Sequence, residues 1–202
     1  MIVKFFARRR FMALVAACGL VLTLAGCFSS ELRDEWPAFT YYTAQPVTVD
    51  AMRLDIVDAY RPPMGAPHVD HLFKITPSRA AQGLARHQII PSGDGRVLRM
   101  IVEDASVRRS TLPPKEGVAG LFSSQPEEKF DARVALRFEL VDELAPDIIR
   151  GRASVVATRE RTLKGNATLA EREVAYHAIV QALVDDLAQG IGTTVGGTFG
   201  KL

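Results

Sequence analysis

The most regular pattern along the chain is an alternation of apolar and polar residues over residues 130–140. A period of two turns one row of side chains toward a core and the other toward water, so this segment is predicted to be a half-buried β-strand. Less regular runs predict strands over residues 47–58, 96–108 and 149–163, and the phase of the first is perturbed near Met52. The run at 96–108 begins apolar on both faces, which favours a central position in the sheet.

Two helices are predicted from their start signals. Thr76 can cap a helix and Pro77 suits a first helical turn, and the apolar residues that follow lie on one face of a short helix over residues 77–89. Thr168 and Glu171 have the spacing of a capping box, in which a hydroxyl and a carboxylate each satisfy a backbone N–H of the first turn. An apolar stripe follows at helical spacing, which predicts a long amphipathic helix.

The end of the chain is rich in glycine, with five glycines between residues 190 and 200. Each glycine costs about 1 kcal/mol relative to alanine inside a helix. The long helix is therefore expected to end at Gly190, and residues 191–202 are expected to form a flexible tail.

The predicted order is strand-helix-strand-strand-strand-helix, which indicates an α+β fold. Consecutive strands joined by turns favour an antiparallel sheet, here of about four strands, with the two amphipathic helices packed on one face. The length of 202 residues suits one such domain, predicted over residues 46–190.

The N-terminus has the architecture of a signal peptide. Lys4 and the three arginines at 8–10 precede an apolar run at 11–26. A membrane-spanning helix needs roughly 20 apolar residues, so this run is short for a span.

Leu24-Ala25-Gly26-Cys27 at the end of that run resembles the lipobox of bacterial lipoproteins. The resemblance implies cleavage between Gly26 and Cys27, alkylation of the Cys27 thiol by diacylglycerol, and acylation of the new amine. Residues 1–26 are then the leader and 27–45 a lipidated tether. The alternative is an unmodified cysteine within an uncleaved signal anchor.

The lipobox resemblance also indicates a location. Acyl chains on Cys27 would hold the protein firmly on a bilayer. In enterobacterial lipoproteins an Asp after the lipidated cysteine retains the protein in the inner membrane, and this chain has Phe28 there. We therefore expect a lipid-anchored protein of the cell envelope, on the outer membrane and facing the periplasm.

Charge argues against a nucleic-acid partner. The chain has 25 Lys and Arg against 23 Asp and Glu, but four of the basic residues and none of the acidic ones precede Cys27. The remainder has 21 basic and 23 acidic residues. The net positive charge thus belongs to the leader.

No pattern of residues indicates catalysis or a cofactor. His68, Asp70 and His71 lie close in sequence beside several prolines, but no third ligand follows at a recognisable spacing, so they are interpreted as surface residues of a loop. Glu103 and Asp104 are adjacent in a strand and are expected to point to opposite faces. The prediction is a protein that is not an enzyme and binds no metal.

The segment of greatest functional interest is the long loop at 110–127, because a loop of this length between strands is usually functional or disordered. It carries Val118, Leu121 and Phe122 in a glycine-containing stretch, and these side chains are candidates for insertion into a partner or a membrane. The alternative is that they fold back over the edge of the core.

The overall pattern resembles the auxiliary lipoproteins of ABC-type lipid transport systems. The shared features are the lipobox, Tyr41-Tyr42 soon after it, an opening strand closed by prolines, a helix, several strands and a long last helix. The chain departs from the family in its short first helix, its 110–127 loop and its glycine-rich end.

The resemblance implies a non-enzymatic adaptor that binds another envelope protein and supports lipid transport or outer-membrane assembly, as do the similar assembly subunits of the lipopolysaccharide export barrel. The alternative is a carrier of a lipid or small ligand, with an apolar cavity of about 300 Å³ or more between sheet and helix.

Overall fold

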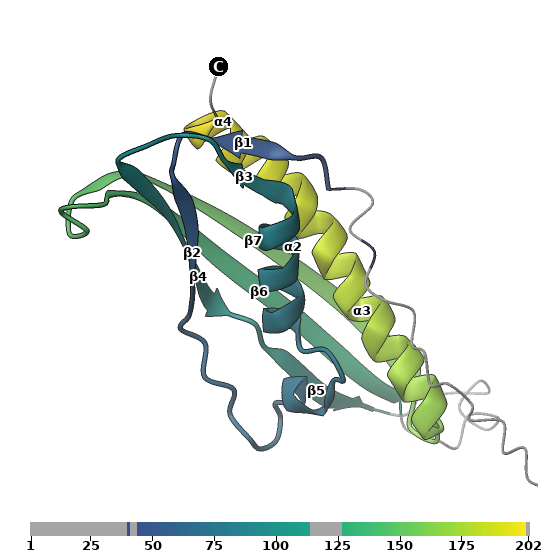
Figure 1. Cartoon of the computed structure of the whole chain (residues 1–202). Helices are drawn as coiled ribbons and strands as arrows, with labels where there is room; N and C mark the ends of the chain where they lie inside the picture. Colours follow the sequence, from purple (N-terminus) through teal and green to yellow (C-terminus); the bar gives the residue numbers. More distant parts are fainter. Residues whose placement is uncertain (1–39, 41–43, 114–126, 201–202) are drawn as a thin grey trace, which may run out of the picture. The chain divides into compact units, whose positions relative to one another are not determined.

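A computed structural model describes residue 40 and residues 44–113 and 127–200, which all belong to one compact unit, 39–202. Its elements are shown in Figure 1. In chain order they are β1 (Val47–Val49), β2 (Arg53–Asp58), the 3-10 helix η2 (Asp70–Leu72), α2 (Pro77–Gln88), β3 (Ile89–Pro91), β4 (Arg96–Asp104), β5 (Val107–Leu112), β6 (Glu127–Asp142), β7 (Ile149–Lys164), α3 (Leu169–Gly190), the π-helix η4 (Ile191–Val195) and α4 (Gly196–Phe199).

The fold is α+β, with a mixed five-stranded sheet centred on β6. β4 and β5 pair with one side of β6, one after the other, and β7 pairs with the other side, all in the antiparallel direction. β2 is added outside β4 in the parallel direction. The expected antiparallel sheet of about four strands is thus corrected. α2 lies between β2 and β4 in the chain, and a crossover through a helix returns the chain in the same direction.

Two of the predicted strands are each divided in two. Residues 47–58 form β1 and β2, with a bend at 50–52 where the phase is perturbed, and β1 pairs in parallel with β3 in a separate two-stranded sheet. Residues 96–108 are divided between β4 and β5, and the register with β6 shifts between Val102 and Asp104. β4 lies between β2 and β6, which confirms its predicted central position.

α2 and α3 cover the same face of the five-stranded sheet, as predicted (Figure 1). Thr76 caps α2 by accepting a hydrogen bond from the backbone N–H of Arg79, and Thr168 and Glu171 form the predicted capping box of α3. The row of apolar residues in β6 that begins at Phe130 is buried beneath the helices. The largest buried side chains include Phe130, Phe138, Leu84, Leu98, Met100, Leu136, Leu183 and Leu187.

The glycine-rich end of the chain differs from the expected flexible tail. It continues α3 through η4 and α4 as far as Phe199. Ile191, Val195 and Phe199 recur every four residues and are all buried in the core. Burial of three apolar side chains outweighs the helix cost of the glycines, since each fully buried side chain contributes about 1.5–3 kcal/mol.

Candidate functional site

The functional residues predicted from the sequence lie outside the described residues. These are Gly26, Cys27, Val118, Leu121 and Phe122. The two ends of the 110–127 loop belong to β5 and β6. Among the described residues, no helix has both the length and the apolar character that crossing a membrane requires.

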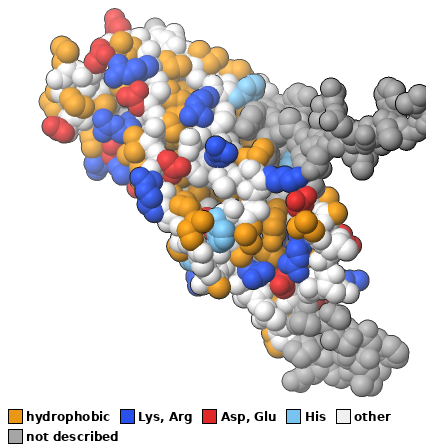
Figure 2. Space-filling view, turned by 60° about the horizontal axis from the view of Figure 1, so that its bottom comes forward, with side chains coloured by type: hydrophobic (Ala, Val, Ile, Leu, Met, Phe, Trp, Pro, Cys, Tyr) orange, Lys and Arg blue, Asp and Glu red, His pale blue; other side chains and the backbone are white. Residues whose placement is uncertain are grey.

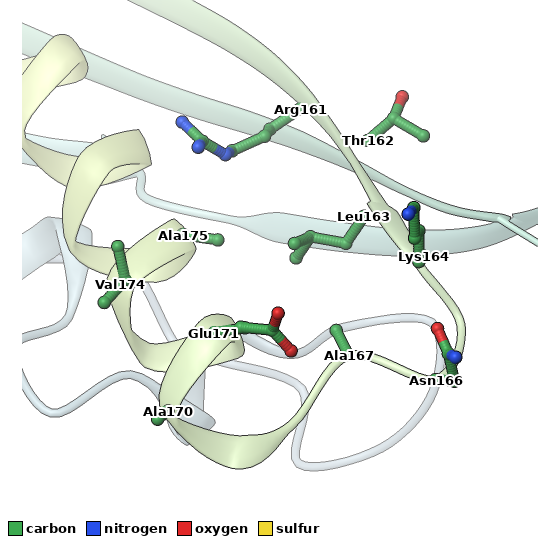
Figure 3. Close-up of a pocket in the computed structure, with 10 residues that line it drawn as sticks. All are labelled: Arg161, Thr162, Leu163, Lys164, Asn166, Ala167, Ala170, Glu171, Val174 and Ala175. Atoms are coloured by element: carbon green, nitrogen blue, oxygen red, sulfur yellow. The ribbon is translucent and has the colours of Figure 1, made fainter.

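The described part of the chain contains an open groove between the end of β7 and the first turns of α3, here called the β7–α3 groove (Figure 3). Its volume is about 560 Å³, which lies in the range of small-molecule sites. Apolar side chains form most of its lining, and they are those of Leu163, Ala167, Ala170, Val174 and Ala175.

Strand alternation decides which side chains of β7 reach this groove. Arg161 is paired with Phe130 in the register between β7 and β6, and Phe130 is buried beneath the helices. Arg161 and Leu163 therefore lie on the helix-covered face of the sheet. Both extend from β7 toward α3 in Figure 3. Thr162 and Lys164 alternate toward the other face and contribute to the rim of the groove.

The turn between β7 and α3 is held by side-chain hydrogen bonds. The backbone N–H and the hydroxyl of Thr168 both donate to Glu171 Oε2, at 2.7 and 2.8 Å. Arg172 donates to two carbonyl oxygens of the turn, at 3.2 and 3.1 Å, and its guanidinium also pairs with Glu128 of β6. One end of the groove is thus tied to both the helix and the sheet.

The ionisable groups of the groove differ in how far they are engaged. Hydrogen bonds from Thr168 lower the pKa of Glu171, and the positive charge of Lys164 lowers it further. Arg161 is exposed and makes no hydrogen bond or ion pair with any described residue. Arg159, two residues earlier on the same face, pairs with Asp186 of α3. The groove therefore presents, beside apolar surface, a guanidinium that has no partner in the described part of the chain.

The segment with His68, Asp70 and His71 is not the solvated loop that the sequence predicts. Asp70 is 2% exposed. Burial raises the pKa of the nearby Tyr60 phenol, and the negative charges of Asp70 and Asp104 raise it further. The described residues contain no group of three or more His, Cys, Asp or Glu placed to hold a metal ion. Asp70 therefore lies in the interior, and His68 and His71 are partly buried beside it.

Glu103 and Asp104 lie on one face of the sheet rather than on opposite faces. The register shift beside Glu103 pairs Asp104 with Ala135, so both carboxylates point away from the helices. They contact different partners: Arg137 Nε donates to Glu103 Oε1 at 2.6 Å, and Arg133 Nε lies 3.2 Å from Asp104 Oδ2. Both residues therefore act in salt bridges of the sheet surface.

The polar row of β6 is also less solvated than its alternation predicts. Glu139 is buried on the helix-free face of the sheet. Arg137 donates to its carboxylate, as does Arg152 at 3.3 Å, and a nitrogen of Arg99 lies 3.9 Å from it. Three guanidinium groups surround one carboxylate, which compensates the burial of its charge.

Comparisons with known proteins leave the family open. The sequence matches no family model, and no curated protein matches it. Similar solved structures include a minor lipoprotein from Acinetobacter baumannii, 15% identical over 76% of this chain and 98% of that one, with a TM-score of 0.38. A Xanthomonas campestris protein of family DUF330 is 12% identical over 80% of this chain and 90% of that one, with a TM-score of 0.33.

A PelC dodecamer from Paraburkholderia phytofirmans is 15% identical over 72% of this chain and 91% of that one, with a TM-score of 0.22. TM-scores this low carry no argument about function. The features that indicate a function are therefore the lipobox-like motif of the sequence and the β7–α3 groove.

Proposed function

We propose that this chain is a lipid-anchored envelope lipoprotein, held by acyl chains on Cys27, whose folded body is a non-enzymatic auxiliary component of lipid transport or outer-membrane assembly. The observation that carries the proposal is the β7–α3 groove. It places a largely apolar, open surface on a body that follows a segment with signal-peptide architecture and a lipobox-like motif.

The surroundings of the groove support a binding role. Large apolar side chains are exposed at the start of α3 and in the segment before α2, and they are Leu169, Val174, Leu72 and Ile75. Lys74 Nζ lies 3.5 Å from Glu173 Oε2, which brings that segment beside α3. Figure 2 shows apolar side chains interspersed with basic ones over the surface. Clustered exposed apolar residues are typical of binding surfaces.

The adaptor function uses this end of the body to contact another envelope protein. β5 and β6 also deliver the two ends of the 110–127 loop here, because Glu127 at the start of β6 pairs with Lys164 beside the groove. A second candidate function is carriage of a lipid or small ligand. It is supported by the volume of about 560 Å³ between sheet and helix, since ligand pockets begin at about 300 Å³.

Photocrosslinking in bacteria that produce the full chain tests the proposed function. A photoreactive residue at position 122 or 174 should capture an identified subunit of an envelope lipid-transport or assembly system. The control is position 144 in the β6–β7 turn, at the opposite end of β7, where Leu144 is 98% exposed. Equal capture of the same proteins from all three positions would contradict the proposal.

A further inference from the structure

The Arg161 side chain in the β7–α3 groove indicates the chemistry of a ligand. Arg161 lies on the helix-covered face of β7, two residues before the apolar Leu163, and has no partner among the described residues. Arg159 occupies the same row and is neutralised by Asp186. Within the described residues, the row therefore changes from an arginine with an acidic partner to one without at the point where the groove opens.

The acidic residue of the groove does not balance this charge. Glu171 accepts two hydrogen bonds from Thr168 through Oε2, so its carboxylate is committed to capping α3. Lys164 at the rim adds a second positive charge that acts on Glu171. Glu171 keeps its negative charge, so Arg161, Lys164 and Glu171 together leave the lining with a net charge of +1, which favours an anion.

The rest of the lining is suited to a hydrocarbon chain. Leu163 is half-buried, Val174 is 58% exposed, and Ala170 leaves room beside them on α3. Each methylene that leaves water for such a surface adds to the affinity. An amphiphile with one chain satisfies both the apolar lining and the cationic edge.

We propose that the β7–α3 groove binds one acyl chain of a membrane lipid with an anionic headgroup, with the Arg161 guanidinium contacting the headgroup and the chain lying along Leu163, Ala170 and Val174. This inference rests on the proposed lipid-related function and names its ligand class. A cationic amphiphile would be repelled by Arg161 and Lys164, and a free anion without a hydrocarbon chain would make no contact with the apolar lining.

The full chain, purified in a neutral detergent, can be titrated with dodecyl phosphate, and the adducts can be counted by native mass spectrometry. We expect saturable binding of one molecule. Dodecyltrimethylammonium, with the same chain and the opposite charge, and inorganic phosphate, with the charge and no chain, should bind at least about tenfold more weakly, a difference of about 1.4 kcal/mol. Raising the salt concentration should weaken dodecyl phosphate binding because Arg161 is exposed.

Two variants separate the parts of the site. Arg161→Gln should weaken dodecyl phosphate binding about tenfold and remove the preference for the anion, since charge-assisted hydrogen bonds are the strong ones. Val174→Asp should weaken the binding of both amphiphiles. Their controls are Arg108→Gln, another exposed arginine without a partner among the described residues, and Leu144→Asp. Both controls should bind as the parent chain does.

Several results would overturn the inference. The first is equal binding of dodecyl phosphate by Arg161→Gln and the parent chain, and the second is equal binding of the two charged amphiphiles by the parent chain. The third is a Val174→Asp variant that dissociates an oligomer without changing lipid binding, because the groove would then be an interface between copies of the chain. Circular dichroism of each variant establishes that it is folded. Crosslinks from position 122 to an envelope transport protein do not depend on lipid binding in the groove. The crosslinking experiment therefore tests the proposed function separately from this inference.

Discussion

Gly190 of α3 packs so closely against Val155 of β7 that a methyl group built on Gly190 would overlap Val155 Cγ1. Val155 is a buried, β-branched side chain with little freedom to move aside. The close approach of helix and strand at this end contrasts with the β7–α3 groove at the other. The absence of a side chain at residue 190 thus lets the C-terminal end of α3 contact the sheet near the middle of β7.

Gly190→Ala is therefore expected to destabilise the protein. Alanine gains about 1 kcal/mol of helix propensity, but overpacking a core costs about 1–3 kcal/mol, so the free energy of unfolding should fall by about 1 kcal/mol. Urea unfolding followed by circular dichroism measures it. The matched control is Gly197→Ala in α4, where an added Cβ meets nothing within 4 Å, and this variant should be as stable as the parent or more so.

A double variant tests whether the contact with Val155 is the cause. Val155→Ala removes the overlapping methyl groups, so Gly190→Ala should cost less in that background than in the parent chain. An equal cost in both backgrounds would show that the close approach is not responsible.

Cys27→Ser is expected to abolish incorporation of radioactive palmitate into the full chain, because a hydroxyl cannot replace the thiol that the lipobox chemistry requires. Autoradiography of the immunoprecipitated chain measures the label. Cys18→Ser is the matched control, since Cys18 lies in the predicted leader and its replacement should leave labelling unchanged. Persistent labelling of Cys27→Ser would contradict lipidation at that residue.

The sequence predicts the parts of the fold that depend on local periodicity. Alternation over 130–140 is sufficient to bury Phe130 and Phe138 on one face of β6, and the Thr168–Glu171 spacing is sufficient to start α3. The parallel pairing of β2 with β4 is not predicted, because the choice of strand partner depends on where the crossover through α2 places β2. The burial of Asp70 is missed for the same reason, since its neighbours come from distant segments.

The sequence indicates the β7–α3 groove less clearly than it indicates the strands and helices. The buried row Ala153, Val155 and Ala157 continues with Arg159 and Arg161, and arginine in an apolar row indicates that the core ends there. The volume of the groove depends on how α3 crosses β7, which the sequence does not state. The burial of the C-terminal end has a signal in the four-residue spacing of Ile191, Val195 and Phe199, which the glycine count obscures.

Phe199→Ala should test whether the C-terminal end is part of the core. Phe199 is 5% exposed, and its ring covers Gly151 of β7, where an added Cβ would lie 2.9 Å from Cε1. Truncation of a buried phenylalanine costs about 3–5 kcal/mol, and a loss near the lower end of that range is expected in urea unfolding. Leu144→Ala, at a 98% exposed position, should change the stability little. Equal stability of both variants would instead support the flexible tail that the sequence predicts.

The capping carboxylate predicts a dependence of stability on pH. Hydrogen bonds from Thr168 lower the pKa of Glu171 in the folded chain from its ordinary value of 4.5. A carboxyl whose pKa is depressed by folding stabilises the folded state above its unfolded pKa, and this contribution is lost as the pH falls through the folded value. Glu171→Gln keeps an acceptor but has no charge, so its thermal midpoint should lie below that of the parent chain at neutral pH.

The difference between the two midpoints should shrink on acidification below about pH 4.5, and thermal unfolding at several pH values measures it. Asp147→Asn is the matched control, because Asp147 is exposed in the β6–β7 turn and has no partner among the described residues. Its midpoint should follow that of the parent chain at every pH. A constant difference for Glu171→Gln across the same range would mean that the cap acts through the shape of the side chain rather than through its charge.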